Sequence, residues 1–368
     1  MVNLCRVYSG ILCLSTIPYQ LERDRQPMEI AEMSTVGLVQ KVTEPFRTPH
    51  DPSTILGIGD DAAVLRPSAT AHTLVSTELL MEGIHFDLVY FPLRYLGFKA
   101  ITAGVSDLIA MGGTPHQVLV TLGLSGRFQV EDVAAIMDGV REACELYRVD
   151  LVGGDTTSSL TGLAIGVTAI GTVPEGDAVL RSTARKDDLI CVTGDLGAAY
   201  MGLQLLVREK RAYDGTPDFQ PEFAGREYIL QRQMKPIARL DILRLFAEVG
   251  LHPTAMIDIT DGLAGDLLRI CKSSDVGCRI FEKRIPIDHE TVGMASDFGL
   301  DPTLCALNGG EDYELLFTAP LTAKELLDTL PGISQIGFVT DAADGYRLVS
   351  SGGSETDITA QGFSKQSS

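Results

Sequence analysis

Carboxylates with glycine and hydroxyl neighbours recur along this sequence in a pattern suited to binding hard cations. They fall in six segments that we expect to form turns, at residues 57–63, 76–78, 105–108, 153–157, 258–262 and 309–313. Two carboxylates about 4 Å apart repel by about 4 kcal/mol at an effective dielectric near 20, so a cluster of them requires bound cations. Oxygen ligands with almost no His or Cys favour Mg²⁺ or Mn²⁺ over zinc. The pattern therefore predicts Mg-dependent phosphate chemistry.

The first segment shows why a metal is needed to bind a nucleotide. Gly57, Gly59 and Ala62 have the spacing of a dinucleotide-binding fingerprint, but Asp60 and Asp61 between them would repel a pyrophosphate. A tight turn with solvated acids is the simpler interpretation of this segment. The chain has no Gly-x-x-x-x-Gly-Lys-Ser/Thr loop, so we expect Mg²⁺ to bridge carboxylates and phosphates instead.

Two further segments each allow a functional and a structural interpretation. Asp107 falls late in an apolar helical pattern, where a carboxylate either lies at an exposed edge or is paired with a cation. Gly153 and Gly154 would let backbone amides approach a phosphate, and Asp155 could hold a metal. The same segment equally fits an ordinary turn.

Asp258 and Asp261 are three residues apart at a predicted strand-to-helix junction, so both can point into one cleft. The alternative is that Thr260 or Asp261 caps the following helix. His85 follows Glu82 and Gly83 and could contact a substrate, although a lone histidine is more often structural.

Length, charge and cysteine content limit the classes of protein. A chain of 368 residues exceeds one typical core and predicts two domains. The net charge of −19 argues against nucleic-acid and anionic-membrane partners. The 7 cysteines include no Cys-x-x-Cys pair, a pattern typical of reduced thiols in a cytoplasmic protein. No apolar run approaches the roughly 18 residues that span a membrane.

The domain boundary is expected where the chain becomes polar, near residues 176–188. We predict a disordered leader at residues 1–30, an N-terminal ATP- and Mg-binding α+β domain at 31–175, and a C-terminal α/β domain at 176–366. Within the leader, Met28 or Met33 is a candidate for the true first residue.

Periodicity predicts the elements that position these segments. We expect helices at residues 35–44, 92–112, 130–149, 198–208 and 262–273, with two more between 226 and 250. We expect strands at 72–80, 118–124, 163–173, 189–193, 254–259, 277–281, 313–318, 336–339 and 346–349. The acidic segments of the second domain then lie at strand ends, where open α/β folds keep their sites.

The ordered set of motifs resembles the thiamine-monophosphate kinase family, in the superfamily of aminoimidazole ribonucleotide synthetase. The resemblance covers about residues 35 to 363. The matching pieces are residues 57–63, 82–86, 106–112, 153–157, 180–182, 258–263 and 309–314.

The resemblance implies ATP-dependent phosphorylation of thiamine monophosphate to thiamine diphosphate with several Mg²⁺ ions. It also implies a homodimer in which the N-terminal sheets form a barrel, with ATP between the domains. The implied metal ligands are Asp61, Ser76, Thr77, Glu78, Asp107, Asp155, Asp258 and Asp261. The implied ATP contacts are Gly154, Asp155, Arg181 and Thr260, and the implied contacts to thiamine monophosphate are His85, Glu311 and Phe363.

Two positions depart from the family pattern. The family usually has Asp where this chain has Glu78, and Mg²⁺ tolerates little distortion of its octahedron. It usually has Asn where this chain has Gly104, which weakens helix propensity. Neither change removes charge from the predicted cluster.

Rival functions remain open at this point. Another ATP-using enzyme of the same fold, such as an aminoimidazole ribonucleotide synthetase, would share most of these motifs. A non-catalytic nucleotide-binding protein would bind ATP without turnover. No covalent nucleophile with an adjacent base is evident, which predicts direct transfer without a phosphorylated enzyme.

Overall fold

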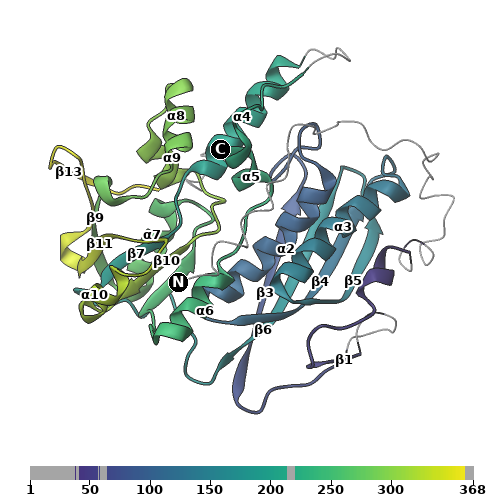
Figure 1. The fold of residues 1–368 in the computed structure, drawn as a ribbon, viewed down its shortest axis with the longest axis horizontal. Coiled ribbons are helices and arrows are strands. Elements are labelled where there is room, and N and C mark those ends of the chain that lie inside the picture. Colours follow the sequence, from purple (N-terminus) through teal and green to yellow (C-terminus); the bar gives the residue numbers. More distant parts are fainter. Residues whose placement is uncertain (1–37, 39–40, 57, 59–63, 214–219, 361–368) are drawn as a thin grey trace.

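Two sheets, each covered by helices, organise the chain into an N-terminal and a C-terminal half (Figure 1). The computed structural model describes residues 38, 41–56, 58, 64–213 and 220–360. Half of the predicted helix at 35–44 lies within these residues, and residues 38 and 41–43 are helical. The predicted leader and the first acidic segment apart from Ile58 lie outside them. Within the described residues no helix has the length and apolar character needed to cross a membrane.

The N-terminal half contains a four-stranded sheet in the order β3-β6-β4-β5. Neighbouring strands are antiparallel except for the parallel pair of β4 and β5. Its elements are β3 (Ala71–Met81), α2 (Leu93–Ala110), β4 (Thr114–Leu124), α3 (Val130–Tyr147), β5 (Asp150–Ser158) and β6 (Ala164–Pro174). They are preceded by a 3-10 turn at Glu44–Phe46 and a small hairpin of β1 (Thr54–Leu56) and β2 (Val64–Leu65).

The C-terminal half contains a seven-stranded mixed sheet in the order β13-β12-β9-β11-β7-β10-β8. Its strands are β7 (Leu189–Thr193), β8 (Ala255–Asp258), β9 (Val276–Phe281), β10 (Leu315–Ala319), β11 (Ile333–Asp341), β12 (Tyr346–Val349) and β13 (Glu355–Asp357). Its helices are α4 (Ala198–Ala212), α5 (Glu227–Met234), α6 (Leu240–Val249), α7 (Leu263–Ser274), α8 (His289–Asp297), α9 (Pro302–Asn308) and α10 (Lys324–Leu327).

Helices α2 and α3 lie side by side on one face of the N-terminal sheet and approach each other closely (Figure 1). Glycines at the crossing permit this approach. A Cβ on Gly97 would lie 2.0 Å from the Ile136 carbonyl oxygen, and one on Gly139 would lie 1.7 Å from the Arg94 carbonyl oxygen. At Gly97 and Gly139 the two backbones therefore pack directly against each other.

The opposite face of the N-terminal sheet is open in the single chain. Along β3, the side chains of Leu74, Ser76, Glu78 and Leu80 point toward the helices. The side chains between them point away from the helices. Of these outward side chains, Val75 is 65% exposed, Leu79 56% and Met81 38%. Large apolar side chains in one row on an uncovered sheet are typical of a contact surface.

A continuous hydrophobic core joins the two halves. It contains Ile101 and Val105 of α2, Leu205 of α4, Met234 of α5 and Phe317 of β10. A second core packs α7 against the other face of the seven-stranded sheet. The helices between the sheets therefore contact both halves, which fixes how acidic residues from each half approach one another.

Most strongly periodic segments match their predictions, including β3, β4, β6 and β7 and helices α2, α3 and α7. The acidic segments, however, are not all turns. Glu78 lies within β3 and Asp107 within α2, as the predicted strand at 72–80 and helix at 92–112 place them, and Asp155 lies within β5. The turn interpretation of residues 153–157 is wrong, because parallel pairing with β4 extends this edge strand through polar residues. Helices α8 and α9 were not predicted.

Candidate active site

Three carboxylates from both halves face one another beside α2. Glu78 comes from β3, Asp107 from α2 and Asp258 from the end of β8. The Ser106 hydroxyl donates to Asp258 Oδ2 at 2.6 Å and thereby ties α2 to β8. Ser76, on the same face of β3 as Glu78, donates its hydroxyl to the carbonyl oxygen of Gly104 at 3.0 Å. Hydroxyl and carboxylate oxygens thus line this junction.

The electrostatics of the three carboxylates show that they repel one another. Burial and the nearby charge of Glu78 raise the pKa of Asp107 to about 6. Burial and the charge of Asp107 raise the pKa of Asp258 to about 6. Burial and the charge of Asp258 also raise the pKa of Glu78, although a hydrogen bond from Asp107 opposes this shift. At neutral pH the cluster therefore favours a neutralising cation.

Arg181 supplies positive charge at the edge of the cluster. It opposes the rise in the pKa of both Asp107 and Asp258. The Ser274 hydroxyl at the end of α7 donates to the Arg181 carbonyl oxygen at 2.9 Å and anchors the segment. The Arg181 side chain is exposed, so its guanidinium remains accessible to an anionic ligand.

Asp261 lies next to the cluster, but neither Asp261 nor Thr260 caps α7. The N-cap is Gly262, and no side chain bonds there. Instead, Asp266 accepts the backbone amides of Thr260 and Asp261 at 3.0 and 3.1 Å. Burial raises the pKa of Asp266 to about 7. Arg269 contacts the carboxylates of both Asp261 and Asp266, so the capping interpretation of this segment is wrong.

The donor set fits a magnesium ion better than a zinc ion. Glu78, Asp107, Asp258 and Asp261 offer hard carboxylate oxygens, and Ser76 offers a hydroxyl. The carboxylates do not form a closed cage. Among the described residues, the only group of three with ligand atoms all within 4.8 Å is Asp288, His289 and Glu290. An open arrangement suits Mg²⁺, which keeps waters and shares phosphate oxygens.

The group at Asp288 has a structural explanation. Its three residues are consecutive at the start of α8, where Asp288 accepts the amide of Glu290 at 2.8 Å as the N-cap. His289 is fully accessible at the surface, with 89% of its side chain exposed. Exposed acidic residues at a helix start are common without a metal.

Thr77, Gly154 and Asp155 are not brought to the carboxylate cluster. Thr77 and Asp155 share the open face of the sheet, because Asp155 pairs with Thr121 and that row continues through Gly166 to Leu79. The Thr77 hydroxyl donates to the Val167 carbonyl oxygen at 3.2 Å. Asp155 is exposed, and among the described residues its carboxylate accepts the neighbouring Thr156 amide at 2.8 Å.

Gly154 requires glycine for a packing reason. A Cβ at this position would lie 1.8 Å from the Val120 carbonyl oxygen of β4. Gly104 is likewise constrained, since a Cβ there would lie 2.7 Å from Cγ1 of Val167. The departure from Asn at Gly104 is therefore matched by a bulky neighbour on β6.

His85 lies in an exposed turn after β3. Its ring Nδ1 accepts the Met81 amide at 3.0 Å, so Nε2 carries the proton of the neutral ring and can donate outward. Phe86 beside it is buried and holds the turn in place. Asp61 and Phe363 lie outside the described residues.

Glu311 lies in a strained loop that meets α2. Its φ is 58°, and the neighbouring Gly310 and Tyr313 have φ of 75° and 53°. The Glu311 amide donates to the Thr260 carbonyl oxygen at 2.9 Å, which links this loop to the acidic β8–α7 segment. Its carboxylate pairs with Lys99 of α2 at 3.0 Å. Strain of this kind is concentrated at functional sites.

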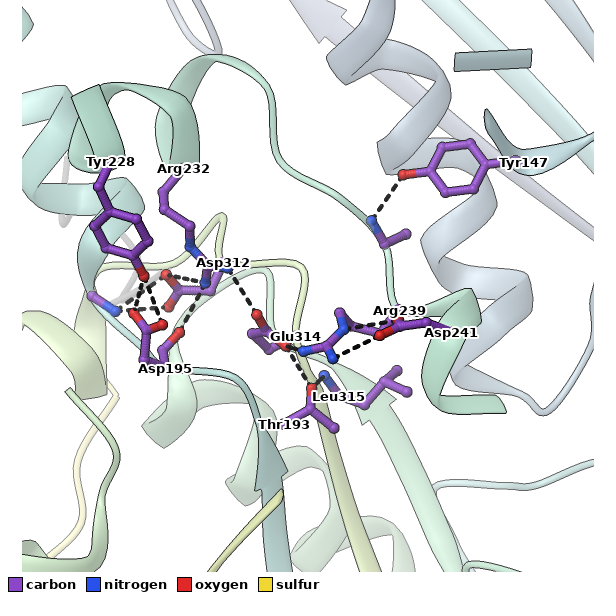
Figure 2. A network of polar contacts seen from close by, with 12 residues as sticks. Tyr147, Thr193, Asp195, Tyr228, Arg232, Arg239, Asp241, Asp312, Glu314 and Leu315 are labelled. Atoms are coloured by element: carbon purple, nitrogen blue, oxygen red, sulfur yellow. Dashed lines mark hydrogen bonds and ion pairs between the residues drawn. The ribbon is translucent and has the colours of Figure 1, made fainter. Parts of the chain in front are cut away.

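A buried ionic network holds the base of the same loop (Figure 2). Arg232 of α5 donates to Glu314 Oε1 at 2.8 Å and to the Asp195 carbonyl oxygen at 2.8 Å. Arg239 donates to Glu314 Oε2 at 2.6 Å. Burial would raise the pKa of Glu314, but Arg232 and Arg239 outweigh it and hold that pKa below its ordinary value. The network therefore fixes where residues 311–314 lie.

Several of these residues were not singled out from the sequence. They are Lys99, Ser106, Asp266, Ser274, Arg232 and Arg239. A lysine at position 99 inside an apolar helical stripe was a usable signal, because a buried ammonium needs a partner. The partners of the other residues are distant in sequence, and no local pattern marks them.

Comparison with known proteins assigns the chain to a family. Residues 59–173 match the AIR synthase related protein N-terminal domain, and residues 185–349 match the C-terminal domain. The thiamine-monophosphate kinase of Bacillus subtilis is 33% identical over 315 residues, which cover 84% of this chain and 92% of that protein.

Solved structures agree with this relation. The thiamine-monophosphate kinase of Stenotrophomonas maltophilia has a TM-score of 0.73 at 31% identity, covering 88% of this chain and 96% of that one. The structure of AaThiL complexed with AMPPCP and TMP has a TM-score of 0.67 at 31% identity and the same coverage. The hydrogenase maturation protein HypE, at 20% identity and a TM-score of 0.68, shares the fold. The chain belongs to the thiamine-monophosphate kinase family of AIR synthase related proteins.

Proposed function

We propose that this protein transfers the γ-phosphoryl group of ATP to thiamine monophosphate and forms thiamine diphosphate. Membership of the family carries the proposal, since relatives of this name align over most of the chain. The AaThiL complex with AMPPCP and TMP supports the pairing of these two substrates. The observation in this chain that fits the activity best is the repelling cluster of Glu78, Asp107 and Asp258.

Magnesium is the cation that we propose for the cluster. When bound, Mg²⁺ would screen the phosphates and neutralise charge on the transferring group. Glu78, Asp107, Asp258, Asp261 and Ser76 face the same junction and would hold it there. Asp61, Thr77 and Asp155 stay proposed ligands on the family resemblance alone. In this conformation Thr77 and Asp155 could not share an ion with Glu78 within one chain, because they lie on the opposite face of the sheet.

The nucleotide and the acceptor would lie on either side of this cluster. For ATP we propose contacts from Arg181 and Thr260, which adjoin the carboxylates. Gly154 and Asp155 stay proposed ATP contacts on the family resemblance alone. For thiamine monophosphate we propose Glu311 at the strained loop, the outward Nε2 of His85, and Phe363. Arg181 would supply a fixed positive charge near the phosphates, as phosphoryl transfer generally requires.

The chemical step needs positioning rather than a strong base. A phosphate oxygen of thiamine monophosphate is already ionised at neutral pH and attacks the γ-phosphorus in line, with ADP as the leaving group. The described cysteines, at positions 144, 191, 271, 278 and 305, are all buried. No covalent nucleophile with an adjacent base is evident in the sequence, and we propose direct transfer without a phosphorylated enzyme.

The decisive experiment mixes the purified full chain with ATP, Mg²⁺ and thiamine monophosphate, and measures thiamine diphosphate by chromatography. We expect turnover that stops in EDTA and returns with excess Mg²⁺. Binding of ATP without any product would instead identify a non-catalytic nucleotide-binding protein. A rate unchanged by EDTA would rule out the metal cluster, and a phosphorylated residue trapped in a single turnover would rule out direct transfer.

A homodimer formed through the open face of the N-terminal sheet is part of the proposal. The exposed row of Val75, Leu79 and Met81 supports it, because water-exposed apolar side chains on a flat sheet gain free energy when covered. A second copy would cover them and would also bring Thr77 and Asp155 into an enclosed space.

A further inference from the structure

Lys99 carries a buried ammonium group. The apolar helix α2 does not require a charged side chain at this position. Its side chain is 1% exposed in the middle of an apolar helix. It donates to the Gln233 carbonyl oxygen of α5 at 3.1 Å, and its Nζ lies 5.4 Å from the centre of the Phe91 ring. Its charge is compensated by the Glu311 carboxylate at 3.0 Å. An ammonium buried without such a partner would be very costly.

Both donors to Glu311 converge on one oxygen of its carboxylate. Lys99 lies 3.0 Å from Oε2, and the Gln233 side-chain amide donates to the same Oε2 at 3.0 Å. The hydrogen bonds that the structure describes for this side chain involve Oε2 alone. The side chain remains 28% exposed, so Oε1 is the oxygen available to a ligand.

Gln233 adds a second acceptor beside this carboxylate. Its side-chain Oε1 is buried and has no hydrogen-bond partner among the described residues, while its Nε2 is committed to Glu311. Buried amide oxygens are seldom left unpaired, and an unpaired one calls for an explanation. An unpaired amide oxygen on the residue that binds Glu311 suits a ligand that brings an N–H donor and positive charge.

Two consecutive residues of α5 bind the loop that contains Glu311. Arg232 binds Glu314 and lies 3.8 Å from Asp312 (Figure 2), while the next residue, Gln233, binds Glu311. Lys99 reaches the same carboxylate from α2 in the N-terminal half. Contacts from both α2 and α5 to the loop of residues 309–314 therefore orient the Glu311 carboxylate.

We propose that Lys99 and Gln233 are positioning residues that hold the Glu311 carboxylate in one orientation, aimed at thiamine monophosphate. The inference rests on the proposed function, since it needs Glu311 to contact this acceptor. Thiamine carries a positively charged ring and an exocyclic amine, which match an anionic oxygen beside an amide oxygen. Lys99 acts through Glu311 and does not itself touch the reacting phosphates.

Replacement of Lys99 with Met tests the inference, because it keeps the length of the side chain and removes its charge. We expect the KM for thiamine monophosphate to rise roughly 10- to 100-fold, the effect of losing a charge-assisted hydrogen bond. The KM for ATP should change less than about 3-fold, since Lys99 lies away from the carboxylate cluster. Gln233→Leu should show the same selective rise.

Lys235→Met is the matched control. Lys235 also joins the two halves, with its Nζ paired to Glu142 and 4.8 Å from the centre of the Phe98 ring. It does not contact Glu311. Its replacement removes a similar contact between the halves, so it should lower the melting temperature without changing the KM for thiamine monophosphate.

A double-mutant cycle separates positioning from a general structural effect. In a Glu311→Gln background, Lys99→Met should add little to the KM for thiamine monophosphate, because the residue through which Lys99 acts is already altered. Additive effects would overturn the inference. So would a Lys99→Met protein with wild-type KM, or equal increases in both KM values.

The result for the wild-type protein distinguishes failure of the proposed function from failure of the proposed role of Lys99 and Gln233. A wild-type protein that neither binds nor phosphorylates thiamine monophosphate overturns the proposed function and this inference together. A wild-type protein that forms product, with no selective change in Lys99→Met or Gln233→Leu, overturns the inference alone. If Lys99→Met fails to fold, as judged by circular dichroism, Gln233→Leu decides the outcome.

Discussion

The carboxyl groups of Asp107 and Asp258 have a pKa of about 6 because burial disfavours their charges, as does the charge of Glu78 near Asp107 and of Asp107 near Asp258. A folded-state pKa above the unfolded value means that ionisation weakens the fold as the pH rises from about 4 to 7. These residues therefore lower stability at neutral pH in the absence of a cation. Such a cost is typical of residues retained for function rather than for the fold.

Asp107→Asn should separate function from stability. We expect kcat to fall by at least about 100-fold, because a charged metal ligand is lost. The melting temperature without Mg²⁺ should stay equal or rise, since the replacement removes a repelling charge. Asp138→Asn, an exposed position on α3, is the control and should retain wild-type kcat. Full activity of Asp107→Asn would contradict the cluster model.

Asp312 gives a second test of buried charge, away from the proposed metal ligands. Burial raises its pKa to about 7, and Arg232 opposes this shift only in part. The folded state then binds a proton more tightly than the unfolded state, so this group's contribution to stability falls as the pH rises from about 4 to 7. In Asp312→Asn, the decline in unfolding free energy between pH 5 and pH 8 should be smaller. Urea titrations of both proteins across this range would measure it, and parallel curves would contradict the assignment.

The sequence predicted the types of site residue better than their grouping. Glu78, Asp107 and Asp258 were identified from local motifs and meet in the fold. Asp155 was identified in the same way but lies on the other face of the sheet. Whether a residue of a strand points to one face or the other depends on register and bulges, and a shift of one residue reverses it. No local motif carries that information.

At the level of elements, the crossing of α2 and α3 depends on glycine. Gly139→Ala should destabilise the fold by about 2–3 kcal/mol, because the added Cβ would lie 1.7 Å from the Arg94 carbonyl oxygen. Urea denaturation would measure the change. Gly126→Ala is the matched control, since an added Cβ there meets no atom within 4 Å, and it should alter stability by less than about 0.5 kcal/mol. Equal effects of the two replacements would contradict close packing of the helices.

The elements found from sequence are those whose hydrophobic period is long and regular. Strand β6 alternates over Ala164–Pro174, and α3 repeats its apolar face over Val130–Tyr147. Strand β5 has two glycines and five hydroxyl or carboxyl side chains, so only its pairing with β4 defines it. Helices α8 and α9 have 9 and 7 residues, too few turns to show a clear period.

At the scale of the whole molecule, the open sheet face predicts self-association. Val75→Lys should convert the proposed dimer to a monomer, because burying an unpaired ammonium at the centre of an apolar surface is strongly unfavourable. Light scattering after size-exclusion chromatography would report the mass. Leu304→Lys, at an apolar residue of α9 that is 53% exposed, is the control and should leave the mass unchanged. A wild-type protein that is already monomeric would contradict the proposed dimer.

The bonds that join the two halves have a consequence for how such a chain can be altered. Ser106 with Asp258, and Lys99 with Glu311, each pair a residue of α2 with one from the C-terminal half. A hybrid that combines one half of this chain with the complementary half of a distant relative would keep both folds but could mismatch these pairs. Recombination within the family should therefore succeed only when α2 is inherited together with β8 and the 309–314 loop.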